Sequence, residues 1–311
     1  MPGVVVLSGG VGGARFVRGL ADVVGADAVT VIGNVGDDDE FYGLHVSPDL
    51  DSLVYALAGL NDERRGWGRR GETWNARETA LALRDDETWF QLGDRDLGLH
   101  LVRTKALRSG EPLSAVTARI AGSLGVRVRI LPATDHRLRT IVETSRGALS
   151  LQEWFVGRRG KDRVEGLRFE GAAFAKPAPG VASAIERASH VVIAPSNPYI
   201  SIWPILAVRS IRSGIQRTKA PVVAVSPIVG GKAVKGPADR MLRRLAGGTS
   251  PAHVAGCYAG LIDALVVDRA DAAGVGAVER LGIRPLVTAT LMRDRRAARR
   301  LAEAALEAAH A

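Results

Sequence analysis

The chain has 311 residues with a formal net charge of +9, is 46% hydrophobic, and has a single cysteine, Cys257. This length fits one large domain or two modest ones, and the composition predicts a globular protein with a sizeable core. One cysteine excludes a disulfide framework and a cysteine-based zinc site. The absence of a signal peptide and of any membrane-spanning apolar stretch leads us to expect a soluble cytoplasmic protein without a membrane partner.

The chain begins with an apolar β-branched run, residues 4–7, which leads into the glycine-rich turn Gly9-Gly10-Val11-Gly12-Gly13 and then a helical pattern over 14–24. This order lets backbone N–H groups and a helix N-terminus face a phosphate. Arg15 stands where a dinucleotide-binding turn requires a third glycine, and no Gly-Lys-Ser/Thr follows. The turn therefore predicts a nucleotide or diphosphate site, with a tight turn that binds no ligand as the alternative.

Four further apolar runs end abruptly in polar or glycine-rich loops or at a polar residue, at residues 29–32, 191–194, 222–225 and 265–267. Such runs are typical of strands buried on both faces of a parallel sheet. Helical patterns alternate with them over 51–60, 181–188, 205–213, 238–245 and 293–308. The alternation predicts an α/β fold with an open, doubly wound, mostly parallel sheet, whose post-strand loops converge on one ligand crevice.

The middle third of the chain has a different character. Residues 62–115 are rich in Arg, Asp, Trp and Gly, and residues 126–175 alternate apolar and polar positions in the manner of antiparallel hairpins. We interpret 62–175 as a mixed α/β insertion that covers the substrate crevice within a single domain spanning 1–311.

Two acidic clusters lie near the expected ligand edge of the sheet. Asp37-Asp38-Asp39-Glu40 follows the 29–32 strand, and Asp49 and Asp51 stand where the next helix begins. Carboxylates without an accompanying His or Cys cluster favour magnesium. A solvated acidic turn and helix capping are the alternatives.

Three other segments are candidates for substrate contacts. Arg95 could clamp a phosphate or carbonyl in a planar fork, or pair with a neighbouring aspartate, and His100 is expected to be a packed side chain rather than a proton-transfer group. The loops at 195–198 and 230–232 could hold a ribose, a base edge or a phosphate, or be turns without a ligand.

Six motifs that occur in order resemble the 2-phospho-L-lactate transferase family of coenzyme F420 biosynthesis. They are Gly9-Gly10-Val11-Gly12-Gly13-Ala14-Arg15, Asn34-Val35-Gly36-Asp37-Asp38, Ser47-Pro48-Asp49-Leu50-Asp51, Leu92-Gly93-Asp94-Arg95-Asp96, Ala194-Pro195-Ser196-Asn197-Pro198 and Val225-Ser226-Pro227-Ile228. Trp67-Gly68 and Glu72-Thr73-Trp74-Asn75 look like the actinobacterial branch.

The resemblance implies a Rossmann-like, magnesium-dependent homodimer of the EC 2.7.8 type. Such an enzyme transfers a phosphoenolpyruvyl or 2-phospholactyl group from enolpyruvyl- or lactyl-2-diphospho-5'-guanosine to the deazaflavin Fo. The products are GMP and (dehydro) coenzyme F420-0. The actinobacterial features favour the enolpyruvyl donor.

The resemblance also assigns roles to residues. The turn Gly9–Gly13 would hold the diphosphate, with Asn34 and Asp49 beside the substrate, while Asn197, Ser226, Gly230 and Lys232 would hold the guanosine. Asp51 and Arg95 match positions that look like Fo contacts, which makes Asp37, Asp51 and Arg95 the catalytic candidates. Asp37 and Asp51 would be the first choices to bind Mg2+, with Asp38 and Asp49 as second choices. The additional Asp39 leaves the choice within the first cluster open, and the general base is an unspecified aspartate of the two clusters.

Two rival functions differ in class. An NAD(P)-dependent oxidoreductase is disfavoured by Arg15 and by the acidic loop. A basic nucleic-acid-binding protein is suggested by the net charge alone. However, the arginines at 293–300 lie on an amphipathic helix and are expected to form a solvated face, and only 5% of the residues are aromatic. We therefore expect no nucleic-acid partner.

Overall fold

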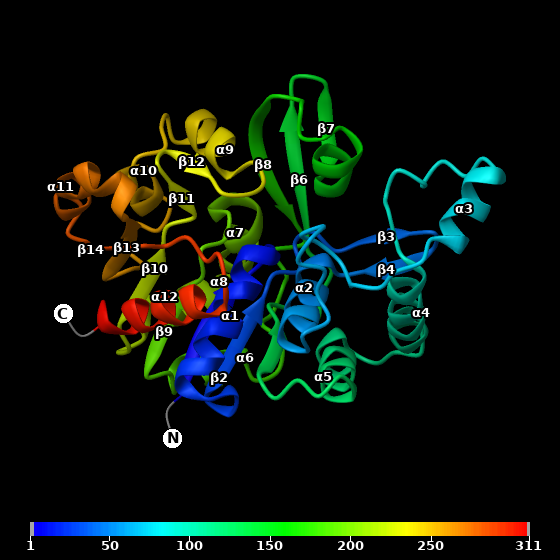
Figure 1. The fold of residues 1–311 in the computed structure, drawn as a ribbon, viewed down its shortest axis with the longest axis horizontal. Helices are drawn as coiled ribbons and strands as arrows, with labels where there is room; N and C mark the ends of the chain where they lie inside the picture. Colours follow the sequence, from blue (N-terminus) through cyan, green and yellow to red (C-terminus); the bar gives the residue numbers. More distant parts are fainter. Residues whose placement is uncertain (1–2, 310–311) are drawn as a thin grey trace.

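The computed structural model describes residues 3–309. Its centre is a seven-stranded parallel sheet in the order β14-β13-β10-β9-β1-β2-β5 (Figure 1). The strands are β1 (Val4–Ser8), β2 (Val29–Gly33), β5 (Arg129–Pro132), β9 (His190–Ile193), β10 (Val222–Val225), β13 (Ala264–Asp268) and β14 (Arg284–Thr288). The predicted α/β fold with a parallel sheet is therefore confirmed.

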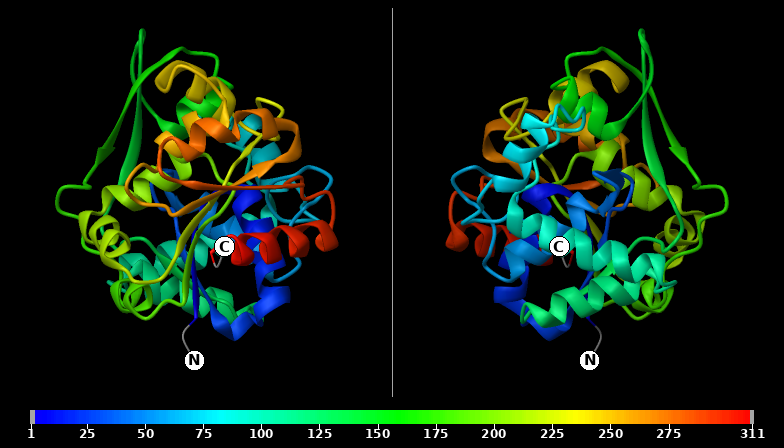
Figure 2. Two further views of the ribbon diagram at one scale, coloured as in Figure 1. Left: turned by 90° about the vertical axis from the view of Figure 1, so that its left-hand side faces the viewer. Right: turned by 90° about the vertical axis from the view of Figure 1, so that its right-hand side faces the viewer.

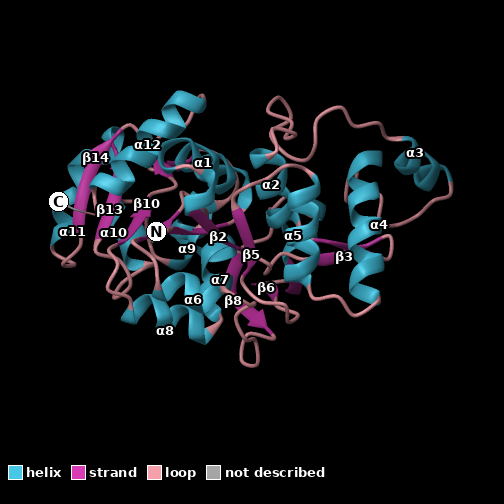
Figure 3. Cartoon of the chain, turned by 90° about the horizontal axis from the view of Figure 1, so that it is seen from below, coloured by secondary structure: helices cyan, strands magenta, loops and turns pink. Residues whose placement is uncertain are grey.

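Helices cover both faces of this sheet. Seen from below, α1, α2 and α12 lie on one side of the strands and α6 and α8 on the other (Figure 3). The helices of eight or more residues are α1 (Gly10–Val24), α2 (Pro48–Leu57), α3 (Asn75–Ala82), α4 (Asp94–Arg108), α5 (Leu113–Ser123), α8 (Arg209–Arg217), α9 (Ala238–Leu245) and α12 (Arg295–Glu307). The shorter ones are α6 (Val181–Glu186), α7 (Trp203–Ala207), α10 (Pro251–Gly256) and α11 (Val275–Glu279).

The first strand lies at the point where the chain order of the sheet reverses. β1 pairs in parallel with β2 on one side and with β9 on the other, with Val4 opposite both Val29 and His190. In doubly wound sheets, ligands bind outside the carboxyl ends of the strands at such a reversal. The crevice is therefore expected where β1 and β9 end, next to the glycine-rich turn.

The helix at the C-terminal end of the described chain packs closely on α1. A Cβ built on Gly19 would lie 2.6 Å from the backbone of Ala298, so only glycine allows this approach. The arginines of α12 and of the segment before it are exposed, and Arg295 forms an ion pair of 2.6 Å with Asp22 of α1. The expected solvated arginine face is confirmed.

Residues 62–175 contribute to several parts of the fold. β6 (Arg139–Thr144), β7 (Gly147–Ser150) and β8 (Val164–Glu170) form the expected antiparallel hairpins, on the side of the molecule opposite the N-terminus (Figure 2). β5 instead pairs in parallel with β2 as the edge of the central sheet, so this range is not an insertion throughout. α3 extends away from the body, near the hairpin of β3 (Asp39–Phe41) and β4 (Leu44–Val46) (Figure 1).

Two other local features differ from the sequence prediction. The helix expected over 205–213 is divided into α7 and α8, because Val208 has an extended ψ of 99° between them. A short hairpin of β11 (Ile228–Val229) and β12 (Lys232–Ala233) follows β10. Among residues 3–309, no helix combines the length and the apolar character needed to cross a membrane.

Candidate active site

The glycine-rich turn joins three segments that are distant in the sequence. α1 begins at Gly10 rather than at Ala14, so most of the turn forms the first turn of the helix. The Gly10 amide donates to Asp49 Oδ1 at 2.6 Å, and the Gly9 amide donates to Ser196 Oγ at 3.3 Å. The end of β1 is therefore tied to the loop after β9 and to the first turn of α2, as the topology predicts.

Two of these glycines are required by protein neighbours. A Cβ on Gly9 would lie 2.8 Å from Ser201 Cβ and closer still to Asp49 Oδ2. A Cβ on Gly13 would lie 2.5 Å from Ser196 Oγ. At Gly12, which is exposed, the nearest atom is Pro195 O at 3.3 Å. Close packing thus explains Gly9 and Gly13, and Gly12 is the exposed position of the three, with Pro195 O as the nearest neighbour of an added Cβ.

Asn34 connects the two acidic clusters. Its side chain is 1% exposed, and the two hydrogens of Nδ2 face three acceptors: Asp49 Oδ2 at 2.9 Å, Ile200 O at 3.0 Å and Asp37 Oδ1 at 3.2 Å. Its Oδ1 accepts from the Gly36 amide at 2.8 Å. A single amide group therefore holds one carboxylate from each cluster at the end of β2.

Asp37 and Asp49 both bond to the side-chain amide of Asn34. Within residues 3–309, neither carboxylate bonds to a positively charged side chain. Burial, then the charge of Asp49 and that of Asp38, raise the pKa of Asp37 well above its usual range. Burial also raises the pKa of Asp49 to about 6, against the opposing hydrogen bonds from Asn34 and Gly10. Two buried carboxylates this close destabilise each other when both are ionised, and a bound cation would relieve that repulsion.

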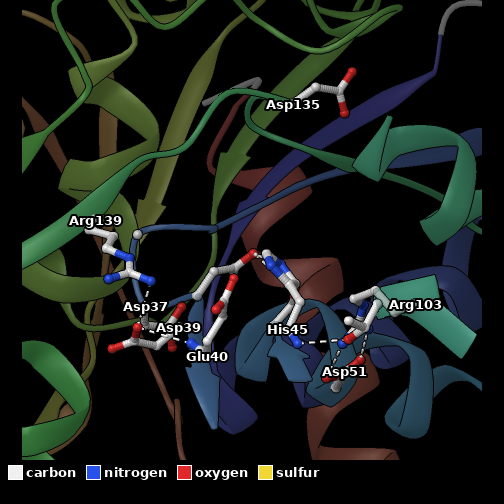
Figure 4. A network of polar contacts seen from close by, with 12 residues as sticks. Asp37, Asp39, Glu40, His45, Asp51, Arg103, Asp135 and Arg139 are labelled. Atoms are coloured by element: carbon white, nitrogen blue, oxygen red, sulfur yellow. Dashed lines mark hydrogen bonds and ion pairs between the residues drawn. The ribbon is translucent and has the colours of Figure 1, made fainter. Parts of the chain in front are cut away.

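The other acidic residues of the first cluster diverge. Asp38 Oδ2 accepts from Ser47 Oγ at 2.8 Å and lies 3.3 Å from His45 Nε2, while its Oδ1 is buried without a partner. Asp39 forms an ion pair of 2.7 Å with Arg139 on β6. Figure 4 shows this pair and the Asp51 pair on opposite sides of His45. The Asp39 carboxylate is thus paired with a cation, whereas Asp37 and Asp38 are not paired with an arginine or lysine among the described residues.

Asp51 belongs to a separate group of buried side chains. Both of its carboxylate oxygens accept hydrogen bonds from Arg103 of α4, one of them at 3.0 Å. His100 Nδ1 lies 3.2 Å from the Arg103 guanidinium. Burial lowers the pKa of His100 to about 4, so this side chain is neutral and packed at neutral pH, as expected.

Arg103 was not predicted from the sequence, although the spacing of polar residues along α4 indicates a polar helical face. Asp96, His100, Arg103 and Thr104 recur on one helical face, and all four are buried. Asp96 accepts from Tyr55 Oη at 2.5 Å, and burial raises the pKa of Asp96 to about 6. A buried face made of polar side chains is unusual for a helix and marks it as part of the site.

The structure leaves Arg95 exposed in the first turn of α4, where its amide donates to Glu72 Oε2 at 2.7 Å. The aspartates proposed as its alternative partners are engaged elsewhere. Asp94 accepts hydrogen bonds from Thr73, Asn75 and Ala76, and Asp96 accepts from Tyr55. The guanidinium of Arg95 is thus at the surface at the start of α4, near Gly71.

The remaining predicted contacts lie in turns whose polar groups also bond within the chain. The Asn197 side chain accepts from the Tyr199 amide at 3.0 Å, and Ser226 Oγ accepts from the Ile228 amide at 3.2 Å. The amides of Gly230 and Gly231 both donate to Asp271 at 2.9 Å. Lys232 is exposed. Asp271 was not foreseen, because nothing in its local sequence points to the 230–231 turn.

A cavity of about 520 Å³ lies beside the first acidic cluster, lined by Asp38, Asp39 and Glu40. Its walls come from the loop between β5 and β6, the β3–β4 hairpin and the α4–α5 region, and they include Asp38, His45, Arg137 and Arg139. This volume is within the range of small-molecule pockets. The glycine-rich turn, Asp37 and Asp49 do not line this cavity, which is connected to them through Asp38 of the first acidic cluster.

Comparisons with known proteins agree with this geometry. A family model described as "2-phospho-L-lactate transferase CofD" matches residues 4–281. Proteins named "Phosphoenolpyruvate transferase" from Streptomyces griseus and Streptomyces coelicolor are 44% and 42% identical to this chain. The first match covers 98% of this chain and 98% of the relative, and the second covers 97% of each. The crystal structure of protein BH3568 from Bacillus halodurans has the same fold, with a TM-score of 0.66 at 19% identity, covering 98% of this chain and 99% of its own.

Proposed function

The chain belongs to the 2-phospho-L-lactate transferase (CofD) family, whose members act as transferases in coenzyme F420 biosynthesis, and we propose that it transfers the phosphoenolpyruvyl group of enolpyruvyl-2-diphospho-5'-guanosine to Fo. The relatives named phosphoenolpyruvate transferase support the enolpyruvyl donor over the lactyl donor. The observation that carries the proposal is the Asn34 group, which holds Asp37 and Asp49 beside the first turn of α1.

In the proposed reaction, the terminal hydroxyl of the Fo side chain attacks the phosphorus that bears the three-carbon acid. The bond between that phosphorus and the oxygen bridging to the guanosine phosphate breaks, and GMP leaves with the bridging oxygen. The hydroxyl proton passes to an aspartate of the two clusters, of which Asp51 faces α4. The product is dehydro coenzyme F420-0. The protein's contribution is to hold the two substrates in line and to balance charge on the transferred group.

The donor would lie across the carboxyl ends of β1 and β9. Its diphosphate would approach the exposed Gly12 at the start of α1, where amide groups and the helix dipole favour an anion. The loops that contain Asn197, Ser226, Gly230 and Lys232 border the same crevice and would hold the guanosine. Arg95 and Asp51 are assigned to the acceptor.

The residues present fit a magnesium ion whose remaining ligands come from water and substrate phosphates. Asp37 and Asp49 are two buried carboxylates whose pKa values are raised, and Asp38 has a buried oxygen without a partner. Within residues 3–309, no three acidic or histidine side chains form a metal-binding group. However, Mg2+ is commonly held by one or two carboxylates together with water and substrate phosphates. When bound, the ion would neutralise charge on the leaving phosphate.

This fit changes which of the predicted aspartates we prefer as metal ligands. The carboxylate of Asp51 is paired with the Arg103 guanidinium, which disfavours a second cation there. Asp49 was expected as a substrate contact and as a second choice for the metal. We therefore place the metal on Asp37 and Asp49, with Asp38 adjacent, and keep Asp51 for the acceptor.

One assay tests the proposal. The protein is mixed with Fo, Mg2+ and each donor in turn, and the product is identified by its mass, since the enolpyruvyl and lactyl products differ by two hydrogens. We expect product and GMP from the enolpyruvyl donor, and none when the metal is chelated. Absence of product with both donors would overturn the function. Tight binding of NADH that is insensitive to magnesium would favour the oxidoreductase instead.

A further inference from the structure

The buried face of α4 is polar, and it lies against β4 and against Asp51 and Tyr55 of α2. Asp96, His100 and Arg103 are 7%, 2% and 1% exposed. Each has a partner in the site or in α4 itself: Asp96 bonds to Tyr55, Arg103 bonds to Asp51, and His100 contacts Arg103. Soluble helices normally bury an apolar face. The sequence of α4 therefore serves a purpose other than packing.

Arg103 is the centre of this face. Its guanidinium holds both oxygens of Asp51, and its Nε is buried without a partner. A planar, two-pronged contact fixes the orientation of a carboxylate more strictly than a single hydrogen bond does. Asp51 therefore has one defined orientation at the start of α2.

Stability alone is a poor explanation for this contact. A buried ion pair loses the hydration of both charges, and apolar side chains of similar volume commonly stabilise a core as well or better. The chain uses a different arrangement where it only joins helices. Arg295 and Asp22 connect α12 to α1 at the surface, where Arg295 stays exposed.

We propose that Arg103 is a positioning residue, which orients the Asp51 carboxylate toward the hydroxyl of the acceptor. This inference rests on the proposed function, which places Asp51 at the acceptor. Each carboxylate oxygen has a second lone pair, so Asp51 can accept the acceptor hydroxyl while it remains bonded to Arg103. The guanidinium also repels a cation at Asp51, which directs the metal to Asp37 and Asp49.

The test uses steady-state kinetics of the full chain with Fo and the enolpyruvyl donor. Arg103→Met should lower kcat/KM for Fo by about 100-fold, which is typical of a misplaced reacting group, while the KM for the donor stays within about threefold. Arg103→Lys restores the charge, so its kcat/KM for Fo should be at least about a tenth of the wild-type value. Binding of Mn2+, measured by electron paramagnetic resonance, should be unchanged in Arg103→Lys and no weaker in Arg103→Met, where Asp51 loses its paired cation.

Two further variants separate positioning from folding. The double variant Arg103→Met with Asp51→Asn removes both charges together, and its kcat/KM should be no lower than that of Asp51→Asn alone, because the two residues act through one contact. Arg295→Met removes an ion pair remote from the crevice and should leave kcat/KM unchanged. Thermal unfolding of each variant reports whether it is folded.

The outcomes are distinct. A folded Arg103→Met variant with kcat/KM for Fo within threefold of the wild type would overturn the inference, as would losses in the double variant that multiply. Equal losses for Fo and donor would also overturn it, because they indicate general damage. If Arg103→Met does not fold, the kcat/KM values for Fo of the double variant and of Arg103→Lys decide whether Arg103 positions Asp51. An inactive wild-type protein would overturn the proposed function itself.

Discussion

Substitution of Gly9 by alanine tests the geometry of the crevice with the smallest possible change. The backbone of Gly9 is extended, with φ of −149°, so alanine adds no backbone strain. The new Cβ would lie 2.8 Å from Ser201 Cβ and 3.1 Å from Asn34 Cβ, and even closer to Asp49 Oδ2. Asp49 must therefore move, because its carboxylate is the nearest group.

The size of the effect follows from the hydrogen bonds that Asp49 would lose. It accepts from the Gly10 amide at 2.6 Å and from Asn34 Nδ2 at 2.9 Å. Hydrogen bonds to a charged group contribute about 1.5 to 3 kcal/mol each. We therefore expect Gly9→Ala to lower the free energy of unfolding by about 3 to 5 kcal/mol, or the melting temperature by roughly 6 to 10 °C. Displacement of the carboxylate should lower turnover by about 100-fold.

The matched control is Gly98→Ala on α4. Gly98 is exposed and its added Cβ would meet no atom within 4 Å. Alanine inside a helix stabilises by up to about 1 kcal/mol relative to glycine, so this variant should be active and slightly more stable. The assays are urea unfolding and GMP release. Wild-type turnover and stability in Gly9→Ala would refute the packing described for the turn.

Three other predictions concern the same site. His100→Asn should remove a pH dependence of stability. The pKa of His100 is about 4 in the folded state and near 6.5 in the unfolded state, so the wild type loses up to about 1.4 kcal/mol of stability per pH unit as pH falls through that window. In the variant, the free energy of unfolding measured in urea should therefore change less steeply with pH between about pH 4.5 and 7. An equal slope would contradict the assignment. Asp37→Asn should weaken Mn2+ binding by at least about tenfold, yet stabilise the metal-free protein at pH 7, because the raised pKa of Asp37 reflects a carboxylate that is unfavourable when ionised; unchanged Mn2+ affinity would exclude it as a ligand. Gly12→Val should block donor binding, measured by titration with the donor in the presence of Mg2+. The added Cβ would lie 3.3 Å from Pro195 O, so the melting temperature should fall modestly while the protein stays folded; unchanged affinity would place the donor elsewhere.

The central strands could be predicted because burial on both faces leaves a continuous apolar run in the sequence. Residues 222–225, for example, are all buried and form β10. β14 lacks this signal: its sequence Arg-Pro-Leu-Val-Thr is partly exposed at the edge of the sheet. β5 was assigned to the hairpin region, since alternation and short apolar runs do not distinguish an edge strand of a parallel sheet from an antiparallel one.

The site was predicted in its residue types but not in its pairings. Asp37, Asp49 and the glycine turn could be placed near one another because they all follow strands or begin helices at one edge of the sheet. Which aspartate pairs with an arginine depends on how α4 packs on α2, and that packing has no local signature except the spacing of Asp96, His100 and Arg103. Asp51 was therefore grouped with Asp37 as a metal ligand, whereas it lies against Arg103.

The distribution of charge in the crevice explains why an anionic donor would need a cation. The Gly10 amide holds the carboxylate of Asp49, and the Gly230 and Gly231 amides hold that of Asp271. Backbone positions suited to a phosphate are thus occupied by carboxylates of the chain itself. A diphosphate that approached Gly12 would meet the charges of Asp49 and Asp37 at short range. Asp37 and Asp49 would hold a divalent ion, which would offset that repulsion, so metal and donor should bind together rather than independently.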